Sequence, residues 1–419
     1  MITFEKFKLD NGLIVILHED ESTPLATVNI LYKVGSRNED PGKTGFAHLF
    51  EHLMFGGSKH VSDYDIPIQE SGGDNNAFTN NDITNFYNVL PGENLETALW
   101  LEADRMLYLN IDQKALDVQK KVVLEEFNET SINLPYGNLW HVLSDTAYKK
   151  HPYRWPTIGM KKEHIANAGL EDVADFFQEN YNPNNAILVI TGRQDIETTR
   201  NLVNKWFGEI PQGPEVVHNI STEPDQQGLR KRLLSDDVPA DAIYMAFHMP
   251  GRLHKDFAAV DLLSDILSGG RSSRFYKKLL KGTTVFSNIQ AYVTGTMDPG
   301  LFVIEAKLMD NATVDEARVL IWNELELLIM EKEEEHELQK VKNGLISSIS
   351  FSEVSVINKA INLAYFEMLG DASMINRQEE EYNQVTTDDI QRVAKQIFRK
   401  ENCSEVIYLK KEEELSLKV

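Results

Sequence analysis

Five residues near the N-terminus, HLFEH at positions 48–52, constrain this chain more than any other stretch of its sequence. On a helix, His48 and His52 lie one turn apart on the same face, so both imidazoles can bind one divalent metal ion. Glu51 lies at the edge of that face, where it can reach a water molecule without binding the metal itself. The pentad is the reversed form of the HExxH motif, and it predicts metal-assisted hydrolysis.

The residues around the pentad favour a helix in an apolar setting. Gly45 offers a flexible entry, apolar residues flank the histidines, and Gly56-Gly57 end the segment. The competing interpretation is an ordinary helix whose histidines fall at i and i+4 by accident. Chance alone gives about 0.03 such pentads in a chain of this composition, so a metal site is favoured. Catalytic zinc commonly takes three protein ligands, which calls for a third.

A candidate third ligand lies in QKKVVLEEFNE, residues 119–129, whose mixed apolar and charged pattern suits a helix with one buried face. This segment offers two neighbouring carboxylates, Glu125 and Glu126. They point about 100° apart on a helix, so only one of them can face the histidines squarely.

The pentad within GFAHLFEHLMF, followed 74 residues after His52 by Glu126, resembles the pitrilysin and insulinase family of zinc peptidases. It is similar in particular to the beta-type subunits of mitochondrial processing peptidases and to bacterial two-subunit relatives. The resemblance implies one Zn²⁺ per chain, held by His48, His52 and Glu126, with Glu51 as the catalytic base. Glu125 would then be a solvated or outer carboxylate.

The resemblance extends along nearly the whole chain. GSRNE at residues 35–39 is similar to the family segment before the metal helix, and GGDNNAFT at residues 72–79 is similar to its substrate strand. It implies that the backbone at Asn76, Ala77 and Phe78 pairs with an extended peptide at a sheet edge. Without the pentad, a Gly/Asn turn leading into a strand would be the preferred interpretation of this stretch.

One departure from the family pattern lies close to the expected metal. Many relatives carry a glutamate seven residues before the third ligand, where this chain has Gln119. Gln119 keeps the hydrogen-bonding capacity of that outer position but carries no charge. Zinc affinity or water activation is therefore expected to differ from that of such relatives.

A second departure lies in the C-terminal half. Relatives that work alone often carry an arginine and, seven residues later, a tyrosine that reach the substrate carbonyl; the corresponding positions here are Leu280 and Ser287. Loss of one such donor typically costs about 100- to 1000-fold in rate. The alternative is that Arg271, Arg274 or Tyr276 takes over the role.

The missing pair implies a partner. By resemblance to two-subunit members, the chain is expected to be the zinc-bearing subunit of a shared active site, with a homologous partner subunit supplying the arginine and tyrosine, or a homodimer. The implied activity is that of a zinc-dependent endopeptidase acting on peptides or small unfolded proteins. The alternative function is a non-catalytic core or scaffold subunit, whose usual mark is a decayed pentad. Here the pentad is intact.

Length and pattern predict two α+β domains, since 419 residues are too many for one small core. We expect a zinc-binding domain at residues 1–212, a polar linker at 213–228 and a C-terminal domain at 229–419 without its own metal site. The resemblance implies two homologous domains of the mitochondrial-processing-peptidase type in a clamshell arrangement. The predicted strands are 13–18, 27–34, 84–90, 186–191, 242–248, 301–308 and 405–409, and long helices are predicted at 314–334 and 337–350.

The formal net charge of −23 argues against binding to nucleic acid and to anionic membranes. It is typical either of a plain acidic surface or of an acidic chamber that attracts basic peptides. Cys403 is the only cysteine, which excludes an intrachain disulfide. No secretory leader and no run of about 18 apolar residues is found, so a cytoplasmic location is expected.

Overall fold

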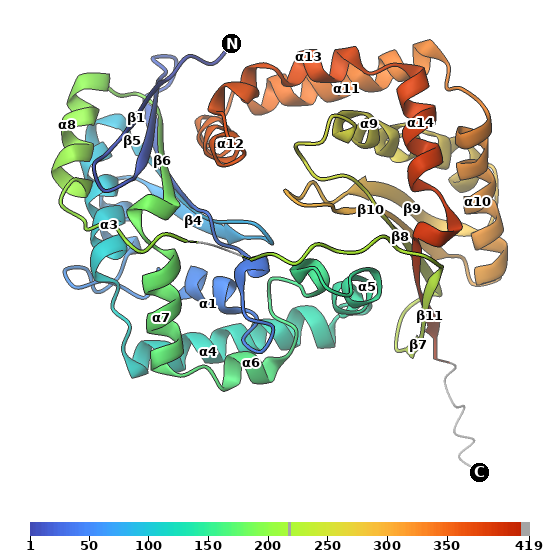
Figure 1. Cartoon of the computed structure of the whole chain (residues 1–419), viewed down its shortest axis with the longest axis horizontal. Helices are drawn as coiled ribbons and strands as arrows, with labels where there is room; N and C mark the ends of the chain where they lie inside the picture. The colour runs from blue at the N-terminus through green and yellow to red at the C-terminus, as the bar shows by residue number, and fades with distance from the viewer. Residues whose placement is uncertain (217–218, 412–419) are drawn as a thin grey trace. The chain divides into compact units, whose positions relative to one another are not determined.

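The structure, a computed structural model, describes residues 1–216 and 219–411. The chain folds into two compact units (Figure 1). Unit 1 consists of Met1–Phe127, Trp155–Ser221 and Ser348–Gln378, and unit 2 consists of Asn128–Arg154, Thr222–Ser347 and Glu379–Val419.

Unit 1 is built on a six-stranded sheet with the order β1-β2-β6-β3-β5-β4. Its strands are β1 (Glu5–Lys8), β2 (Ile14–Glu19), β3 (Leu25–Tyr32), β4 (Asp74–Thr79), β5 (Thr84–Pro91) and β6 (Ala186–Gly192). β2 and β6 are parallel, and all other neighbours are antiparallel. β6 is buried along its whole length, as its apolar sequence AILVITG suggests for a strand covered on both faces. The polar strand β4 lies at the edge of the sheet.

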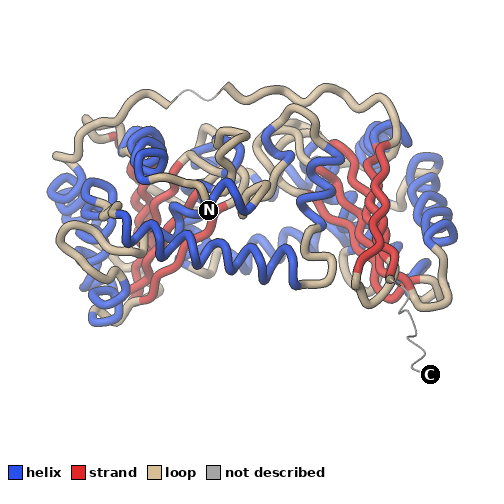
Figure 2. Tube along the Cα trace, turned by 90° about the horizontal axis from the view of Figure 1, so that it is seen from below, coloured by secondary structure: helices blue, strands red, loops and turns tan. Residues whose placement is uncertain are grey.

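Helices cover both faces of this sheet (Figures 1 and 2). α3 and α8 lie on one face, and α12 packs across β3 and β6 on the other. The helices of unit 1 are α1 (Phe46–Leu53), α2 (Asp65–Glu70), α3 (Leu95–Tyr108), α4 (Gln113–Phe127), α6 (Lys162–Ala166), α7 (Leu170–Asn180), α8 (Ile196–Phe207) and α12 (Val356–Met368).

Unit 2 repeats this plan with a five-stranded sheet of order β7-β11-β8-β10-β9. Its strands are β7 (Arg230–Asp236), β8 (Ala242–His248), β9 (Phe286–Val293), β10 (Leu301–Leu308) and β11 (Cys403–Lys410). Its helices are α5 (Leu139–Ala147), α9 (Phe257–Ser268), α10 (Val314–Met330), most of α11 (Glu335–Ser352), α13 (Gln378–Gln384) and α14 (Thr387–Ile397). α5 packs on β7, β8 and β11, and α9 packs on β9.

The two sheets have the same topology. β2-β6-β3-β5-β4 of unit 1 corresponds in order and direction to β7-β11-β8-β10-β9 of unit 2, with one parallel pair at the same place. β1 is the additional strand of unit 1. The prediction of two homologous α+β domains is therefore confirmed.

The units interleave along the chain, which a division at residues 213–228 does not anticipate. α5 lies in the N-terminal half of the sequence but belongs to unit 2, and α12 lies in the C-terminal half but belongs to unit 1. Each of these helices packs against the sheet of its unit. A mostly apolar sheet has two faces to cover, and the exchanged helix supplies part of one cover.

The predicted strands are present, with ends shifted by a few residues at most. β8 and β10 occupy the predicted residues 242–248 and 301–308. The predicted helix at 314–334 ends at Met330. Among the described residues, no helix has both the length and the apolar character that crossing a bilayer requires.

Arg392 of α14 binds Asp256, the N-cap residue of α9, and this contact gives a prediction about stability. Its guanidinium donates to both oxygens of the largely buried Asp256, at 2.8 and 2.9 Å, and to Asp389 at 2.8 Å. Since Arg392 is partly exposed, we expect Arg392→Met to destabilise the protein by only about 1–2 kcal/mol at pH 7. Thermal unfolding measures this change.

The same contact predicts how the effect depends on pH. Arg392 lowers the pKa of Asp256, and it lowers the pKa of Asp389 to about 2. A carboxyl whose pKa is lowered on folding stabilises the protein above its ordinary pKa and loses that contribution as the pH falls. The difference between Arg392→Met and the natural protein should therefore shrink as the pH falls from about 4 towards 2. An equal stability difference between the variant and the natural protein at pH 7 and pH 3 would contradict this prediction. Arg377→Met, at an exposed pair with Asp371, is the matched control.

Candidate metal centre

The helix α1 carries the pentad, and its apolar face fixes it in the core of unit 1. Phe46, Leu49, Phe50 and Leu53 are buried. Phe50 stacks on two aromatic rings, those of Phe176 on α7 and of Tyr181, the residue that follows α7. The ring centroid of Phe50 lies 5.3 Å from that of Phe176 and 5.0 Å from that of Tyr181. The histidines lie on the other face of the helix, as the predicted i, i+4 spacing requires.

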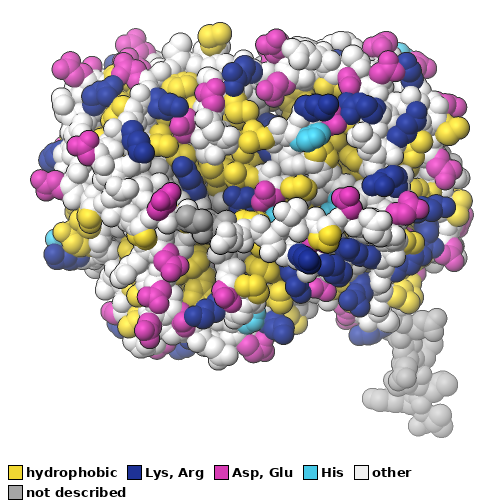
Figure 3. Space-filling model, in the orientation of Figure 1, with side chains coloured by type: hydrophobic (Ala, Val, Ile, Leu, Met, Phe, Trp, Pro, Cys, Tyr) yellow, Lys and Arg dark blue, Asp and Glu magenta, His cyan; other side chains and the backbone are white. Residues whose placement is uncertain are grey.

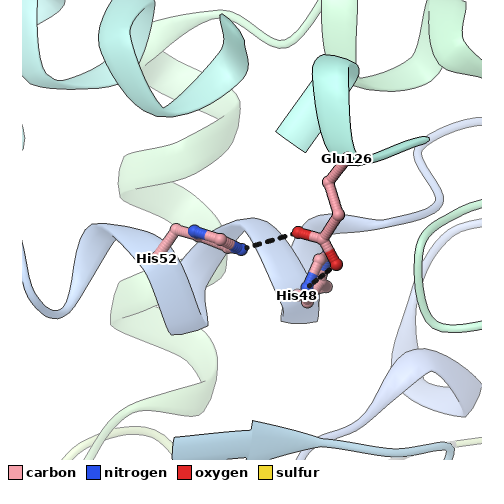
Figure 4. A group of neighbouring side chains, drawn as sticks. All are labelled: His48, His52 and Glu126. Carbon is pink, nitrogen blue, oxygen red and sulfur yellow. Dashed lines mark ion pairs between the residues drawn. The ribbon is translucent and has the colours of Figure 1, made fainter. Parts of the chain in front are cut away.

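His48, His52 and Glu126 meet in one place (Figure 4). The Nε2 atom of His48 lies 3.6 Å from Glu126 Oε1, and that of His52 lies 3.3 Å from Glu126 Oε2. The ligand atoms of the three residues all lie within 4.8 Å of one another. Glu126 reaches the histidines from α4, which packs against α1. The structure thus brings together the three residues that the sequence predicts as metal ligands.

The surroundings set the protonation of this cluster. Burial lowers the pKa of His48, so its imidazole is neutral, which is the form that binds metals. The hydrogen bond with His52 lowers the pKa of Glu126, so its carboxylate is ionised. Two imidazoles and one carboxylate make a donor set that suits zinc. The facing Nε2 and carboxylate atoms therefore fit a zinc ion.

Glu51 lies beside the cluster but outside it. Burial raises the pKa of its carboxyl, and contacts with Thr79 at the end of β4 oppose that rise. A carboxylate whose pKa is moved towards neutrality is suited to take a proton and release it again. Thr79 was not among the predicted site residues, although it belongs to the segment that resembles a substrate strand.

The predicted substrate strand is β4, and it has one free edge. Asn76, Ala77 and Phe78 pair with β5 on one side, and β4 is the last strand of the sheet. The Ala77 N–H donates to Asn76 Oδ1 at 2.8 Å and the Asn75 N–H to Asp74 Oδ1 at 2.9 Å. α1 lies against β4. An extended peptide added at this edge would run beside the metal cluster.

The remaining predicted residues near the cluster lie on α4. Gln119 lies two helical turns before Glu126 and is half-buried. Glu125 is exposed, and the metal-ligand cluster includes Glu126 and not Glu125. The structure thus supports the choice of Glu126 between the two neighbouring carboxylates.

The described residues of unit 2 form no metal-ligand cluster of this kind. Across the described residues, the cluster on α1 and α4 is the one group of three His, Cys, Asp or Glu side chains able to share a metal ion. Leu280 ends a short helical turn and Ser287 lies on the edge strand β9. Arg274, one alternative source of the missing donor, is held by Glu324 at 3.3 Å and Glu333 at 3.1 Å. Arg271 is exposed.

Comparisons with known proteins agree with this geometry. The family model described as "Insulinase (Peptidase family M16)" matches residues 14–161, and the model described as "Peptidase M16 inactive domain" matches residues 167–345. The zinc protease PqqE of Helicobacter pylori is 30% identical over 412 residues, covering 97% of this chain and 92% of the relative. The chain belongs to the insulinase (M16) family of zinc metallopeptidases.

Other M16 proteins are similar over most of their length. The mitochondrial-processing peptidase subunit beta of Lentinula edodes is 24% identical over 92% of this chain and 85% of its own. The crystal structure of a protease from Helicobacter pylori superposes with a TM-score of 0.94 at 29% identity, covering 98% of this chain and all of the other. A Pseudomonas fluorescens structure described as a peptidase M16 inactive domain shares the fold, with a TM-score of 0.87 at 16% identity and 98% of each chain covered.

Proposed function

We propose that this M16 chain is a zinc-dependent endopeptidase that hydrolyses peptides or small unfolded proteins. The observation that carries this proposal is the meeting of His48, His52 and Glu126, with Glu51 beside them, next to the free edge of β4. A peptide on that edge and a metal ion in that cluster would place a scissile bond within reach of Glu51.

The metal ligands and Glu51 would have different roles in hydrolysis. His48, His52 and Glu126 would hold the zinc ion. Bound zinc would polarise the scissile carbonyl and lower the pKa of water. Glu51 takes a proton from the attacking water molecule and passes it to the nitrogen of the leaving amine. The raised pKa of Glu51 makes its carboxylate a stronger base for the first transfer, from water.

The edge of β4 supports extended peptides as the substrate class. Main-chain hydrogen bonds to a sheet edge bind an extended backbone with little regard to side chains. A folded protein offers few such segments, whereas a peptide or an unfolded chain offers many. On the face drawn in Figure 3, basic and acidic side chains are interspersed, so the excess acidic charge does not by itself define a docking face for basic peptides there.

We further propose that this chain is the zinc-bearing subunit of a shared active site. Leu280 and Ser287 have no cationic or phenolic group to offer a substrate carbonyl, and Arg274 is engaged by two glutamates. A homologous partner subunit would supply the missing donors, and a homodimer is the alternative assembly. A non-catalytic scaffold subunit is the second candidate, favoured by the match of residues 167–345 to an inactive-domain model. The intact pentad favours the catalytic role.

Cleavage of a mixed set of quenched-fluorescent peptides tests both parts of this proposal. The chain is purified alone and also from its native source with an affinity tag, so that a bound partner is retained, and zinc is quantified in both samples. We expect zinc-dependent cleavage by the complex and cleavage at least about 100-fold slower by the chain alone. Full activity of the lone chain would contradict a site shared with a different subunit. A zinc-loaded complex that cleaves nothing would favour the scaffold role.

A further inference from the structure

The N-terminus of the metal helix α1 has no capping side chain of its own. Gly45 occupies the N-cap position, and the first N–H groups of any helix lack partners within the helix. A residue with a side chain does not fit there. Gly45 has φ +91°, and an added Cβ would lie 2.9 Å from the Ile158 carbonyl oxygen and from the Ile165 side chain. The cap must therefore come from elsewhere in the chain.

Glu39 supplies that cap. The Gly45 N–H donates to Glu39 Oε2 and the Ala47 N–H donates to Glu39 Oε1, both at 2.9 Å. The side chain is buried, and the indole of Trp155 donates to Oε2 at 3.2 Å and to the Ser36 carbonyl oxygen at 2.9 Å. Both oxygens of one carboxyl group thus hold the first turn of α1 against the preceding loop.

Opposing electrostatic effects act on the Glu39 carboxyl group. A negative group near the N-terminus of a helix is stabilised by the helix dipole. Burial raises the pKa of Glu39 to about 8, and the donors from Ala47, Gly45 and Trp155 offset only part of that rise.

The backbone that Glu39 binds is next to a metal ligand in the sequence. Ala47, whose N–H is bound by Glu39, is the residue before His48. A shift of this first turn would displace the His48 ring, whereas His52 lies a full turn further along α1. We propose that Glu39 is a positioning residue that sets His48 for zinc binding by capping the metal helix. This inference rests on the proposed zinc site but requires no peptidase activity.

The affinity for zinc alone tests this inference. Glu39→Gln keeps the shape of the side chain but leaves one backbone N–H without an acceptor. Loss of an outer partner of a metal ligand typically costs about 10- to 100-fold in metal affinity, and we expect a loss of that size from a competition titration with a chelator. We also expect cobalt in the variant to show an altered absorption spectrum, because the position of one imidazole changes.

Glu223→Gln is the matched control. The buried Glu223 carboxylate accepts backbone N–H groups from Lys149, Lys150 and His151 in unit 2, whereas the metal helix belongs to unit 1. We expect this variant to lose thermal stability but to keep natural zinc affinity. Natural zinc affinity in folded Glu39→Gln would overturn the inference, and so would an equal loss of affinity in Glu223→Gln.

A second variant covers the case in which Glu39→Gln does not fold. Trp155→Phe removes one donor to the Glu39 carboxylate, together with the donor to the Ser36 carbonyl oxygen, and leaves both backbone hydrogen bonds to Glu39 in place. A smaller loss of zinc affinity than in Glu39→Gln is expected, and unchanged affinity in this variant would count against the role of Glu39. Because the titration uses only the metal, failure of the chain to cleave peptides would leave the result intact.

Discussion

Replacement of Glu51 by Gln is expected to leave zinc bound and to slow peptide hydrolysis by about 100- to 10,000-fold, the usual range for removal of a general base. The glutamine would keep the size of the side chain, but an amide cannot take a proton from water at neutral pH. Glu51 lies outside the cluster of His48, His52 and Glu126, so metal content should not change. Steady-state cleavage and metal analysis of the same preparation measure both effects.

The control for this experiment is Glu125→Gln. It removes the same charge from an exposed position close in sequence to a metal ligand. We expect this variant to cleave peptides nearly as fast as the natural protein. A Glu51→Gln variant that turns over at the natural rate would mean that another group takes the proton, and the assignment of Glu51 would be wrong.

Replacement of a metal ligand is expected to have a different signature. His52→Ala and Glu126→Gln each leave two of the three donors, and catalytic zinc commonly depends on three. We expect zinc content to fall below about a tenth of one equivalent after dialysis, with activity lost in proportion. Metal analysis of the purified variants gives the answer without reference to any substrate.

The comparison of Glu126→Gln with Glu125→Gln makes this test specific. The two carboxylates are adjacent, and only that of Glu126 faces the histidines, at 3.3 and 3.6 Å. Loss of zinc in Glu126→Gln and retention in Glu125→Gln is the predicted outcome. The reverse result would show that α4 presents the other carboxylate to the metal.

The histidines of the metal cluster were predictable because the two residues are close together in the sequence. His48 and His52 share a face through helix periodicity alone. The choice of Glu126 over Glu125 depended on a family resemblance, since spacing on α4 only shows that the two point apart. Only the structure shows Thr79 near Glu51, because the two residues come from different elements.

Glu39 was not predictable for a similar reason. Local caps leave a signature such as Ser or Asp directly before the helix. Here the cap is a carboxylate six residues earlier, brought to Gly45 by the fold. The glycine that suggested a flexible entry is instead held rigidly by its positive φ and its close neighbours.

The strands were easier to predict than the helix ends or the exchange of helices. β8 and β10 are apolar runs with turn residues on both sides, and their predicted bounds agree with the structure. α10 ends at Met330 although the next residues, EKEE, have good helix propensity, since Glu331 adopts an extended conformation. The apolar face of α12 shows that it must pack, but not against which sheet.

The most direct test of a zinc peptidase working at the edge of β4 is a crystal structure of Glu51→Gln with zinc and a bound peptide, using anomalous scattering at the zinc edge. The predicted result is one zinc peak about 2.0–2.2 Å from the Nε2 atoms of His48 and His52 and from a carboxylate oxygen of Glu126, with the peptide paired to Asn76–Phe78. A zinc peak elsewhere, or a peptide bound away from β4, would contradict the account.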